Sequence, residues 1–277
     1  MRPEQDFNEM EQRRSHVTYD DLLQGLWKLG ISPGDHLVVH LALSSFGYVE
    51  GGVNTLIDVL LKVIGEEGTL LAPYFVNYKD SDELFDLSIL PPPVTGALPA
   101  TLITRSGARI SAQPSHAVVA IGALSEVLTQ NQMYKTPVGI GSPFDKLAKA
   151  NGKVLLLGVN QKANTMIHTG EAYANLPFWG KPRPDLPEGR WVKPLGEEKR
   201  WVKLVGIPGC SSGFEKITPF IEERNLIHSI RIGSANCRVM NAQSLIQAVV
   251  DFLKEDQRRL FCDRPSCTFC NWASEFL

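Results

Sequence analysis

The stretch GDHLVVHLALSSFGYVEGGVNTLIDVLLKVIGEEGTLLAPYF, residues 34–75, decides the fold class. Its two ends, residues 36–43 and 69–75, are nearly all apolar and bounded by turn residues, which predicts two buried strands. Between them, residues 54–64 carry an apolar stripe at helical spacing, and residues 65–68 end that helix. Strands that are apolar throughout need cover on both faces of their sheet. The stretch therefore predicts an α/β fold.

The same alternation of helix and strand continues along the chain in both directions. Residues 18–21 resemble a capping box at the start of a helix. Residues 153–159 (KVLLLGV) are the clearest buried strand, and residues 164–174 follow it as a helix. Two similar RWVK runs, residues 190–193 and 200–203, predict a hairpin. We expect a central mixed sheet covered by helices on both faces, with a smaller α+β portion from the C-terminal third.

Composition and charge exclude several classes of protein. The 277 residues carry a formal net charge of −2, with 43% hydrophobic and 21% charged residues. These values exclude disorder on a large scale and argue against a protein that coats nucleic acid, so no nucleic-acid partner is expected. No apolar run approaches the roughly 20 residues that span a bilayer, and residues 1–16 lack a signal-peptide pattern. A cytoplasmic protein without a membrane partner is expected, and its oligomeric state stays open.

The loop at residues 44–52 is the first candidate binding site. It contains Ser44, Ser45 and three glycines directly before a helix, so its backbone N–H groups could bind an anion. The alternative is that the glycines only permit a tight turn from strand to helix. The pattern matches neither GxxxxGK[ST] nor GxGxxG, so the common nucleotide fingerprints are not met.

The second candidate site follows the strongest strand. His168 and Glu171 are three residues apart in a predicted helix, so they lie on one face and can touch. A carboxylate beside an imidazole orients it and stabilises its protonated form, which a general base needs. The alternative is a half-buried ion pair. His116 and His40 lie at a strand start and inside a strand, and both fit satisfied polar residues of the core as well as a site.

The C-terminal cysteines raise the question of a metal. Cys262, Cys267 and Cys270 could bind zinc with Cys210 or Cys237 as the fourth ligand. The C-x2-C pair occurs once rather than twice, so the sequence favours free thiols and assigns no metal ligand. No GxSxG or HExxH motif supports a hydrolase.

Three segments resemble the antibiotic N-acetyltransferases of the aminoglycoside 3-N-acetyltransferase type. Residues 34–75 resemble the family's GD-x-LLVHSSLSALG-x-V-x-GG and GTL-x-P-x-F motifs. Residues 95–122 (TGALPATLITRSGARISAQPSHAVVAIG) resemble its TG-x-LPE and HPTHS segments, with Gln113 in place of the first histidine of HPTHS. Residues 142–171 (SPFDKLAKANGKVLLLGVNQKANTMIHTGE) resemble its SP-x-x-KL, VLLLG and NT-x-LH-x-AE segments.

The resemblance implies transfer of an acetyl group from acetyl-CoA to an amine, typically the 3-amino group of a 2-deoxystreptamine aminoglycoside. It makes residues 1–277 a single acetyltransferase domain, in which residues 177–210 could form a hairpin insertion in a minor subdomain. His168 becomes the catalytic base, Glu171 its partner, and His116 a catalytic residue where CoA and acceptor meet. The residues implied in binding CoA are His40, Ser44, Ser45, Gly51, Gly52, Val53 and Ser115. Ser115 or backbone N–H groups would stabilise the oxyanion.

A polycationic acceptor favours a cleft lined with carboxylates. The long segment at residues 77–100 offers Asp80, Asp82 and Glu83 for this purpose, and Tyr74 is assigned to the same acceptor site. Two alternatives stay open: transfer to an amine that is not an aminoglycoside, and a non-catalytic protein that binds CoA or zinc. A role in antibiotic resistance or in metabolism also stays open.

Overall fold

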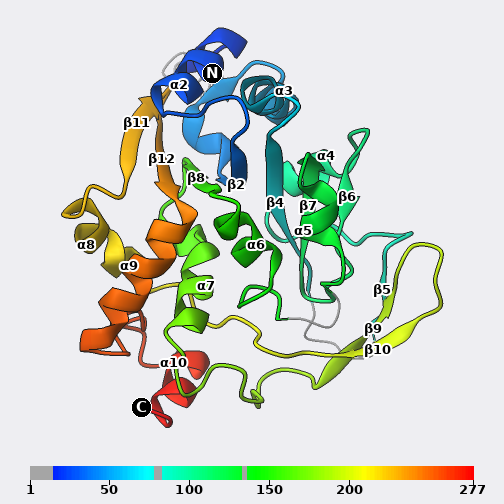
Figure 1. Cartoon of the computed structure of the whole chain (residues 1–277), viewed down its shortest axis with the longest axis vertical. Helices are drawn as coiled ribbons and strands as arrows, with labels where there is room; N and C mark the ends of the chain where they lie inside the picture. The colour runs from blue at the N-terminus through cyan, green and yellow to red at the C-terminus, as the bar shows by residue number, and fades with distance from the viewer. Residues whose placement is uncertain (1–14, 78–82, 133–135) are drawn as a thin grey trace, which may run out of the picture.

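The computed structural model describes residues 15–77, 83–132 and 136–277, and within them a seven-stranded mixed sheet forms the centre (Figure 1). The strand order is β11-β12-β8-β2-β4-β7-β6. The three middle strands are parallel: β8 (Lys153–Leu157), β2 (His36–Leu41) and β4 (Thr69–Phe75). The outer strands pair antiparallel: β7 (His116–Gly122), β6 (Arg109–Ile110), β12 (Ala235–Asn241) and β11 (His228–Ile232). The expected central mixed sheet is confirmed.

Helices cover both faces of the sheet, and the alternation along β2 shows why. Leu37 and Val39 enter one apolar core and Val38 enters the other, because successive side chains of a strand point to opposite faces. The first core packs against α2 (Tyr19–Lys28), α3 (Gly52–Ile64) and α4 (Ala97–Leu102). The second packs against α5 (Ser125–Thr129), α6 (Pro143–Lys149), α7 (Met166–Tyr173), α8 (Thr218–Glu222), α9 (Ala242–Glu255) and α10 (Thr268–Ser274).

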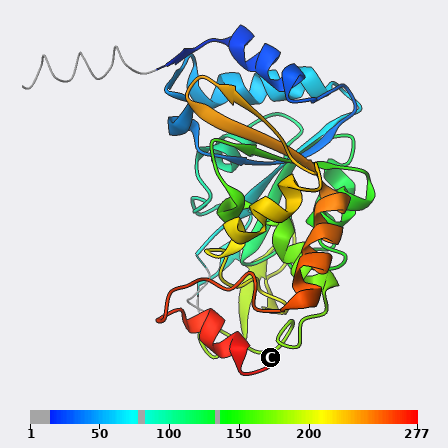
Figure 2. The same cartoon turned by 90° about the vertical axis from the view of Figure 1, so that its left-hand side faces the viewer.

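The smaller elements complete the fold. The predicted hairpin is confirmed, because β9 (Gly189–Lys193) and β10 (Arg200–Lys203) pair antiparallel, and β5 (Phe85–Asp86) joins β9. A separate pair joins β1 (His16–Val17) to β3 (Tyr48–Val49). Three 3-10 turns are η1 (Leu43–Phe46), η2 (Gln161–Ala163) and η3 (Phe214–Ile217). Figure 2 shows α10 at the end of the molecule opposite α2 and α3.

Local sequence signals set several of these element boundaries. The capping box before α2 is present, with Thr18 and Asp21 exchanging hydrogen bonds. Residues 214–222 form η3 followed by α8 rather than one continuous α-helix. Pro219 lacks the N–H that a continuous α-helix would donate to the carbonyl of Glu215. The chain therefore forms a 3-10 turn first, and a new α-helix begins at Thr218 with the proline in its first turn.

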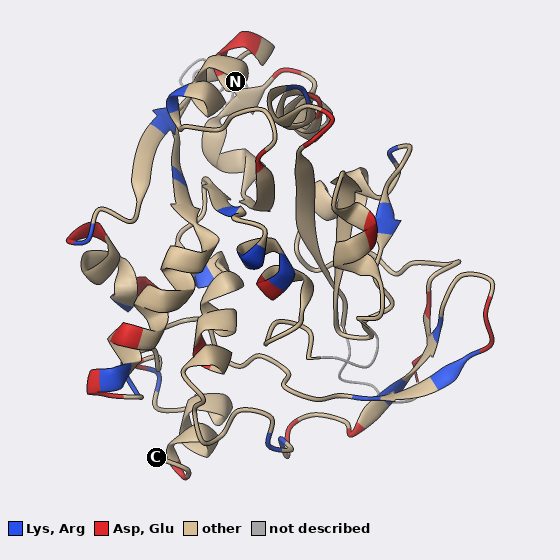
Figure 3. Ribbon diagram, viewed as in Figure 1, with Lys and Arg blue, Asp and Glu red and all other residues tan. Residues whose placement is uncertain are grey.

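The C-terminal third supplies the expected α+β portion, and that portion is continuous with the main sheet. The β11–β12 hairpin extends the sheet beside β8, and α9 packs against α7 (Figure 1). In Figure 3, Lys and Arg are interspersed with Asp and Glu along the chain rather than gathered in one patch. None of the helices in the described ranges combines the length and the apolar character needed to cross a membrane.

Candidate active site

The site lies where the carboxyl ends of the parallel strands meet. His40 is near the end of β2, Phe75 ends β4, and His116 begins the antiparallel neighbour β7. Phe75 and His116 are cross-strand partners whose ring centroids lie 4.3 Å apart, edge to face. A cavity of about 340 Å³ opens at this edge of the sheet, as expected for a ligand site in an α/β protein. Its wall includes His40, Phe75, Leu98, His116, Lys162 and His168.

The pair His168 and Glu171 is formed as predicted. Nδ1 of His168 lies 2.6 Å from Oε2 of Glu171, and the two residues are only 6% and 3% exposed. The hydrogen bond directs the Nδ1 proton to the carboxylate and leaves the lone pair of Nε2 to accept a proton. His168 lines the cavity, whereas Glu171 does not, and the Phe214 ring meets the imidazole edge to face at 4.6 Å. The arrangement is that of a general base held by a buried carboxylate.

The start of α7 fixes where His168 points. Oδ1 of Asn164 accepts the backbone N–H of Met166, and its Nδ2 donates to Oε1 of Gln161. Asn164 is buried at the cavity wall. A side chain that accepts a backbone N–H at a helix start anchors the first turn. Asn164 therefore positions the turn that carries His168, a role the sequence did not assign to it.

His116 is held in position by a chain of hydrogen bonds. Oε1 of Gln113 accepts the backbone N–H groups of Ser115 and His116, which fixes the orientation of this amide. The Ser115 hydroxyl donates to the same oxygen, so its own oxygen accepts from Nδ1 of His116 at 2.8 Å. Burial, followed by the nearby charges of His168 and Arg183, lowers the pKa of His116 to about 3. His116 is thus a neutral imidazole near pH 7, and it lines the same cavity as His168.

Ser115 is placed differently from its expected roles. It is completely buried, is absent from the cavity wall, and gives its hydroxyl proton to Gln113. Its position orients His116 rather than facing an oxyanion. Gln113, whose oxygen holds Ser115 and His116, had no predicted role, and its place at a histidine of the family motif was the signal for it.

His40 contacts the segment that precedes α7. Its Nε2 accepts the backbone N–H of Thr165 at 3.4 Å, and both residues line the cavity. Burial lowers the pKa of His40 to about 4, so the imidazole is neutral near pH 7. His40 is both a satisfied core residue and a wall of the cavity.

The loop at residues 44–52 lies outside the wall of this cavity. Gly51 and Gly52 have φ values of 66° and 63°, so the turn into α3 needs glycine at both positions. The Ser45 hydroxyl donates to the carbonyl of Gly158, just after β8. Neither Ser44 nor Val53 is buried. The tight-turn interpretation accounts for the glycines, and CoA binding by this loop stays a prediction.

Of the residues expected to bind the acceptor, Tyr74 and Glu83 lie outside the wall of the cavity. The Tyr74 hydroxyl donates to the carbonyl of Pro91, and its ring lies in the core on the α3 face. Oε2 of Glu83 pairs with Nη2 of the buried Arg190 at 3.0 Å. Asp80 and Asp82 lie outside the described residues, and no carboxylate is among the described residues of the cavity wall.

Comparisons with known proteins agree on one family. The family model for aminoglycoside 3-N-acetyltransferase matches residues 38–254. An aminoglycoside N(3)-acetyltransferase III of Salmonella sp is 32% identical, with 84% of this chain and 90% of that protein covered. A crystal structure of aminoglycoside acetyltransferase AAC(3)-IVa in complex with a gentamicin superposes with a TM-score of 0.81 at 25% identity, covering 95% of this chain and 98% of that one. The binary complex of AAC-IIIb with CoASH superposes with a TM-score of 0.74 at 27% identity, covering 91% of this chain and 100% of that one.

Proposed function

The chain belongs to the aminoglycoside 3-N-acetyltransferase family, and on that premise we propose that it transfers the acetyl group of acetyl-CoA to an aminoglycoside amine. The amine is the 3-amino group of a 2-deoxystreptamine ring. The observation that carries the proposal is the buried pair of His168 and Glu171 at the wall of a cavity at the ends of the parallel strands. Acetyl-CoA is the co-substrate, and the cytoplasm is the expected compartment.

The geometry supports direct transfer. The acceptor amine is mostly protonated near pH 7 and must lose a proton before it attacks the thioester carbonyl. The ammonium group first loses one proton to solvent. As the new N–C bond then forms and the C–S bond breaks, His168 takes a second proton from the attacking nitrogen and passes it to the leaving CoA sulfur. Glu171 stabilises the imidazolium that forms in between, because a buried charge needs a partner. Holding both substrates in one cavity adds the effect of proximity.

The donor and the acceptor approach from different elements. The exposed end of the loop at residues 44–52, with the first turn of α3, is the proposed contact for the CoA phosphates. Lys162 is an exposed cation in the cavity wall, and its charge suits the same phosphates. Asp80 and Asp82 remain the proposed contacts for the polycationic acceptor.

The experiment is a thiol-release assay with acetyl-CoA and a panel of amines. Gentamicin and apramycin represent the 2-deoxystreptamine class, and simple polyamines represent other amines. Release with the first group, with NMR placing the acetyl group on the 3-amino nitrogen, supports the proposal. Release only with other amines contradicts the acceptor assignment. No release with any amine, although CoA binds, contradicts the enzymatic function.

A further inference from the structure

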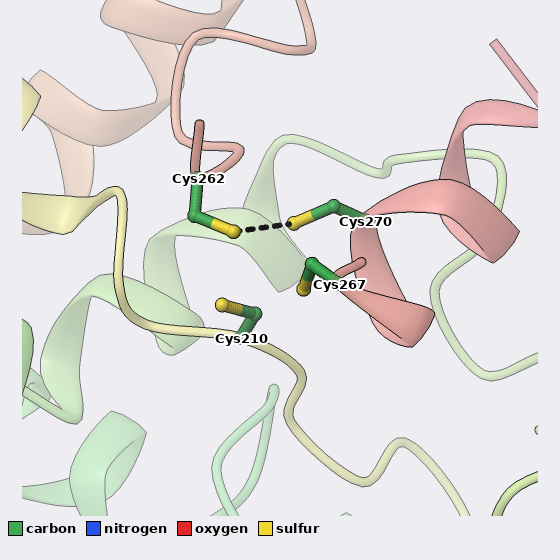
Figure 4. A group of neighbouring side chains, drawn as sticks. All are labelled: Cys210, Cys262, Cys267 and Cys270. Atoms are coloured by element: carbon green, nitrogen blue, oxygen red, sulfur yellow. Dashed lines mark hydrogen bonds between the residues drawn. The ribbon is translucent and has the colours of Figure 1, made fainter. Parts of the chain in front are cut away.

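Four cysteine side chains converge between α10 and the segment that precedes η3. The sulfur atoms of Cys210, Cys262, Cys267 and Cys270 all lie within 4.8 Å of one another. Figure 4 shows the four side chains grouped together, with the sulfurs of Cys262 and Cys270 turned toward each other. All four are free thiols in the structure. The fifth cysteine, Cys237, lies on β12 inside the core on the α3 face and takes no part in the group.

We propose that Cys210, Cys262, Cys267 and Cys270 bind one structural zinc ion. A tetrahedral site with Zn–S bonds of about 2.3 Å places its sulfurs ~3.8 Å apart. The sulfurs of Cys262 and Cys270 are 3.8 Å apart, and the remaining pairs stay within 4.8 Å. Four thiolates without a fifth ligand form a closed site, which suits a structural rather than a catalytic ion.

The surroundings of the sulfurs fit bound thiolates. Four thiolates and Zn²⁺ carry a net charge of about −2, and each thiol releases a proton when the ion binds. The guanidinium of Arg264 lies 3.6 Å from Sγ of Cys210 and also donates to the hydroxyl of Ser212. The backbone N–H of Ser212 points to the same sulfur at 3.4 Å. Such donors to the ligand sulfurs orient them and offset part of the charge.

The site has a consequence for the active-site cavity. Pro208, Gly209 and Ser211, which flank the ligand Cys210, form part of the cavity wall. Gly209 packs so closely on the ring of Phe269 in α10 that a Cβ at this position would lie 2.1 Å from the ring. A zinc ion bound by Cys210 and Cys270 would hold this segment of the wall in a fixed position relative to α10. Its role is to position the wall, not to take part in acetyl transfer.

The test is the metal content of the full-length protein purified with zinc in the medium and dialysed under reducing conditions. We expect about one zinc per chain for the wild type and for Cys237→Ser, which removes the cysteine outside the group. Cys267→Ser should retain less than about a tenth of that amount. Co²⁺ exchanged into the wild type should show the visible absorption of a tetrahedral tetrathiolate site, a readout that needs no variant to fold.

Several results would overturn the proposal. Wild-type protein that holds no stoichiometric zinc and shows no tetrathiolate spectrum with Co²⁺ would do so. Equal zinc in Cys267→Ser and Cys237→Ser would also contradict it. A native mass lower by two hydrogens would show a disulfide in place of the metal site. None of these results depends on which amine the enzyme acetylates.

Discussion

The imidazole of His168 donates from Nδ1 to Oε2 of Glu171 across 2.6 Å, one turn along α7, and only the histidine reaches the cavity. The negative charge of Glu171 therefore lies on the side of the imidazole that faces away from the cavity. The carboxylate can stabilise the imidazolium without meeting the cationic acceptor. In the proposed mechanism, this arrangement lets the buried His168 take a proton from the amine nitrogen.

The charge of Glu171 should contribute to turnover beyond its role in orientation. Glu171→Gln keeps an oxygen acceptor for Nδ1 and removes the negative charge. A hydrogen bond to a charged group is worth about 1.5–3 kcal/mol, which corresponds to a fall in kcat of about 10- to 100-fold. Steady-state kinetics with a calorimetric measurement of CoA affinity checks this. An unchanged kcat would show that the carboxylate only orients the ring.

Gln113 should be important for stability because its oxygen accepts three hydrogen bonds. Gln113→Leu leaves two buried backbone N–H groups and the Ser115 hydroxyl without this acceptor. We expect the free energy of unfolding to fall by about 2 kcal/mol or more, and kcat/KM to fall with it as His116 loses its position. The matched control, Gln243→Leu on the exposed face of α9, should stay within about 0.5 kcal/mol. If urea unfolding showed the same loss of stability for Gln113→Leu and Gln243→Leu, the role of Gln113 would be contradicted.

The buried His40 should make the protein less stable in mild acid. Burial lowers its pKa from 6.5 to about 4, so between these values the unfolded chain binds more protons than the folded one. The free energy of unfolding should therefore decrease as the pH falls through this window. His40→Gln keeps an acceptor for the N–H of Thr165 and removes the titration. Between about pH 7.5 and about pH 5, the wild type should lose about 2 kcal/mol more than this variant. An equal decrease in the free energy of unfolding for the wild type and His40→Gln over this range would contradict the lowered pKa of His40.

The two similar hairpin strands offer a matched pair of arginines. Arg190 is 1% exposed and donates to the carbonyls of Asn77, Glu83 and Pro114, whereas the Arg200 side chain is 49% exposed beside Glu197. Arg190→Leu should cost about 2–4 kcal/mol, because these carbonyls lose their donors. Arg200→Leu should change stability by less than about 0.5 kcal/mol. Chemical unfolding of both variants separates the two roles.

The features that the sequence predicted are those encoded locally. The Thr18–Asp21 capping box, the buried strands β2 and β4, and the contact of His168 with Glu171 all follow from spacing within one element. The strands β11 and β12 were not predicted, because β11 is mostly exposed at the sheet edge and β12 mixes buried, half-buried and exposed residues without a strict alternation.

Interactions between distant segments explain the rest. The choice of Cys210 over Cys237 as the neighbour of the C-terminal cysteines depends on how the segment that precedes η3 packs against α10. The same holds for Glu83, whose partner Arg190 lies over a hundred residues away. No spacing rule within one element could reveal these contacts.

The most direct test of the account is the turnover of His168→Ala with acetyl-CoA and an accepted aminoglycoside, measured beside its CoA affinity. A positioned general base contributes ~10²–10⁴-fold, so kcat should fall by that factor while the dissociation constant of CoA stays within about twofold. Turnover equal to that of the wild type, with the same affinity for CoA, would contradict the assignment of His168 as the base.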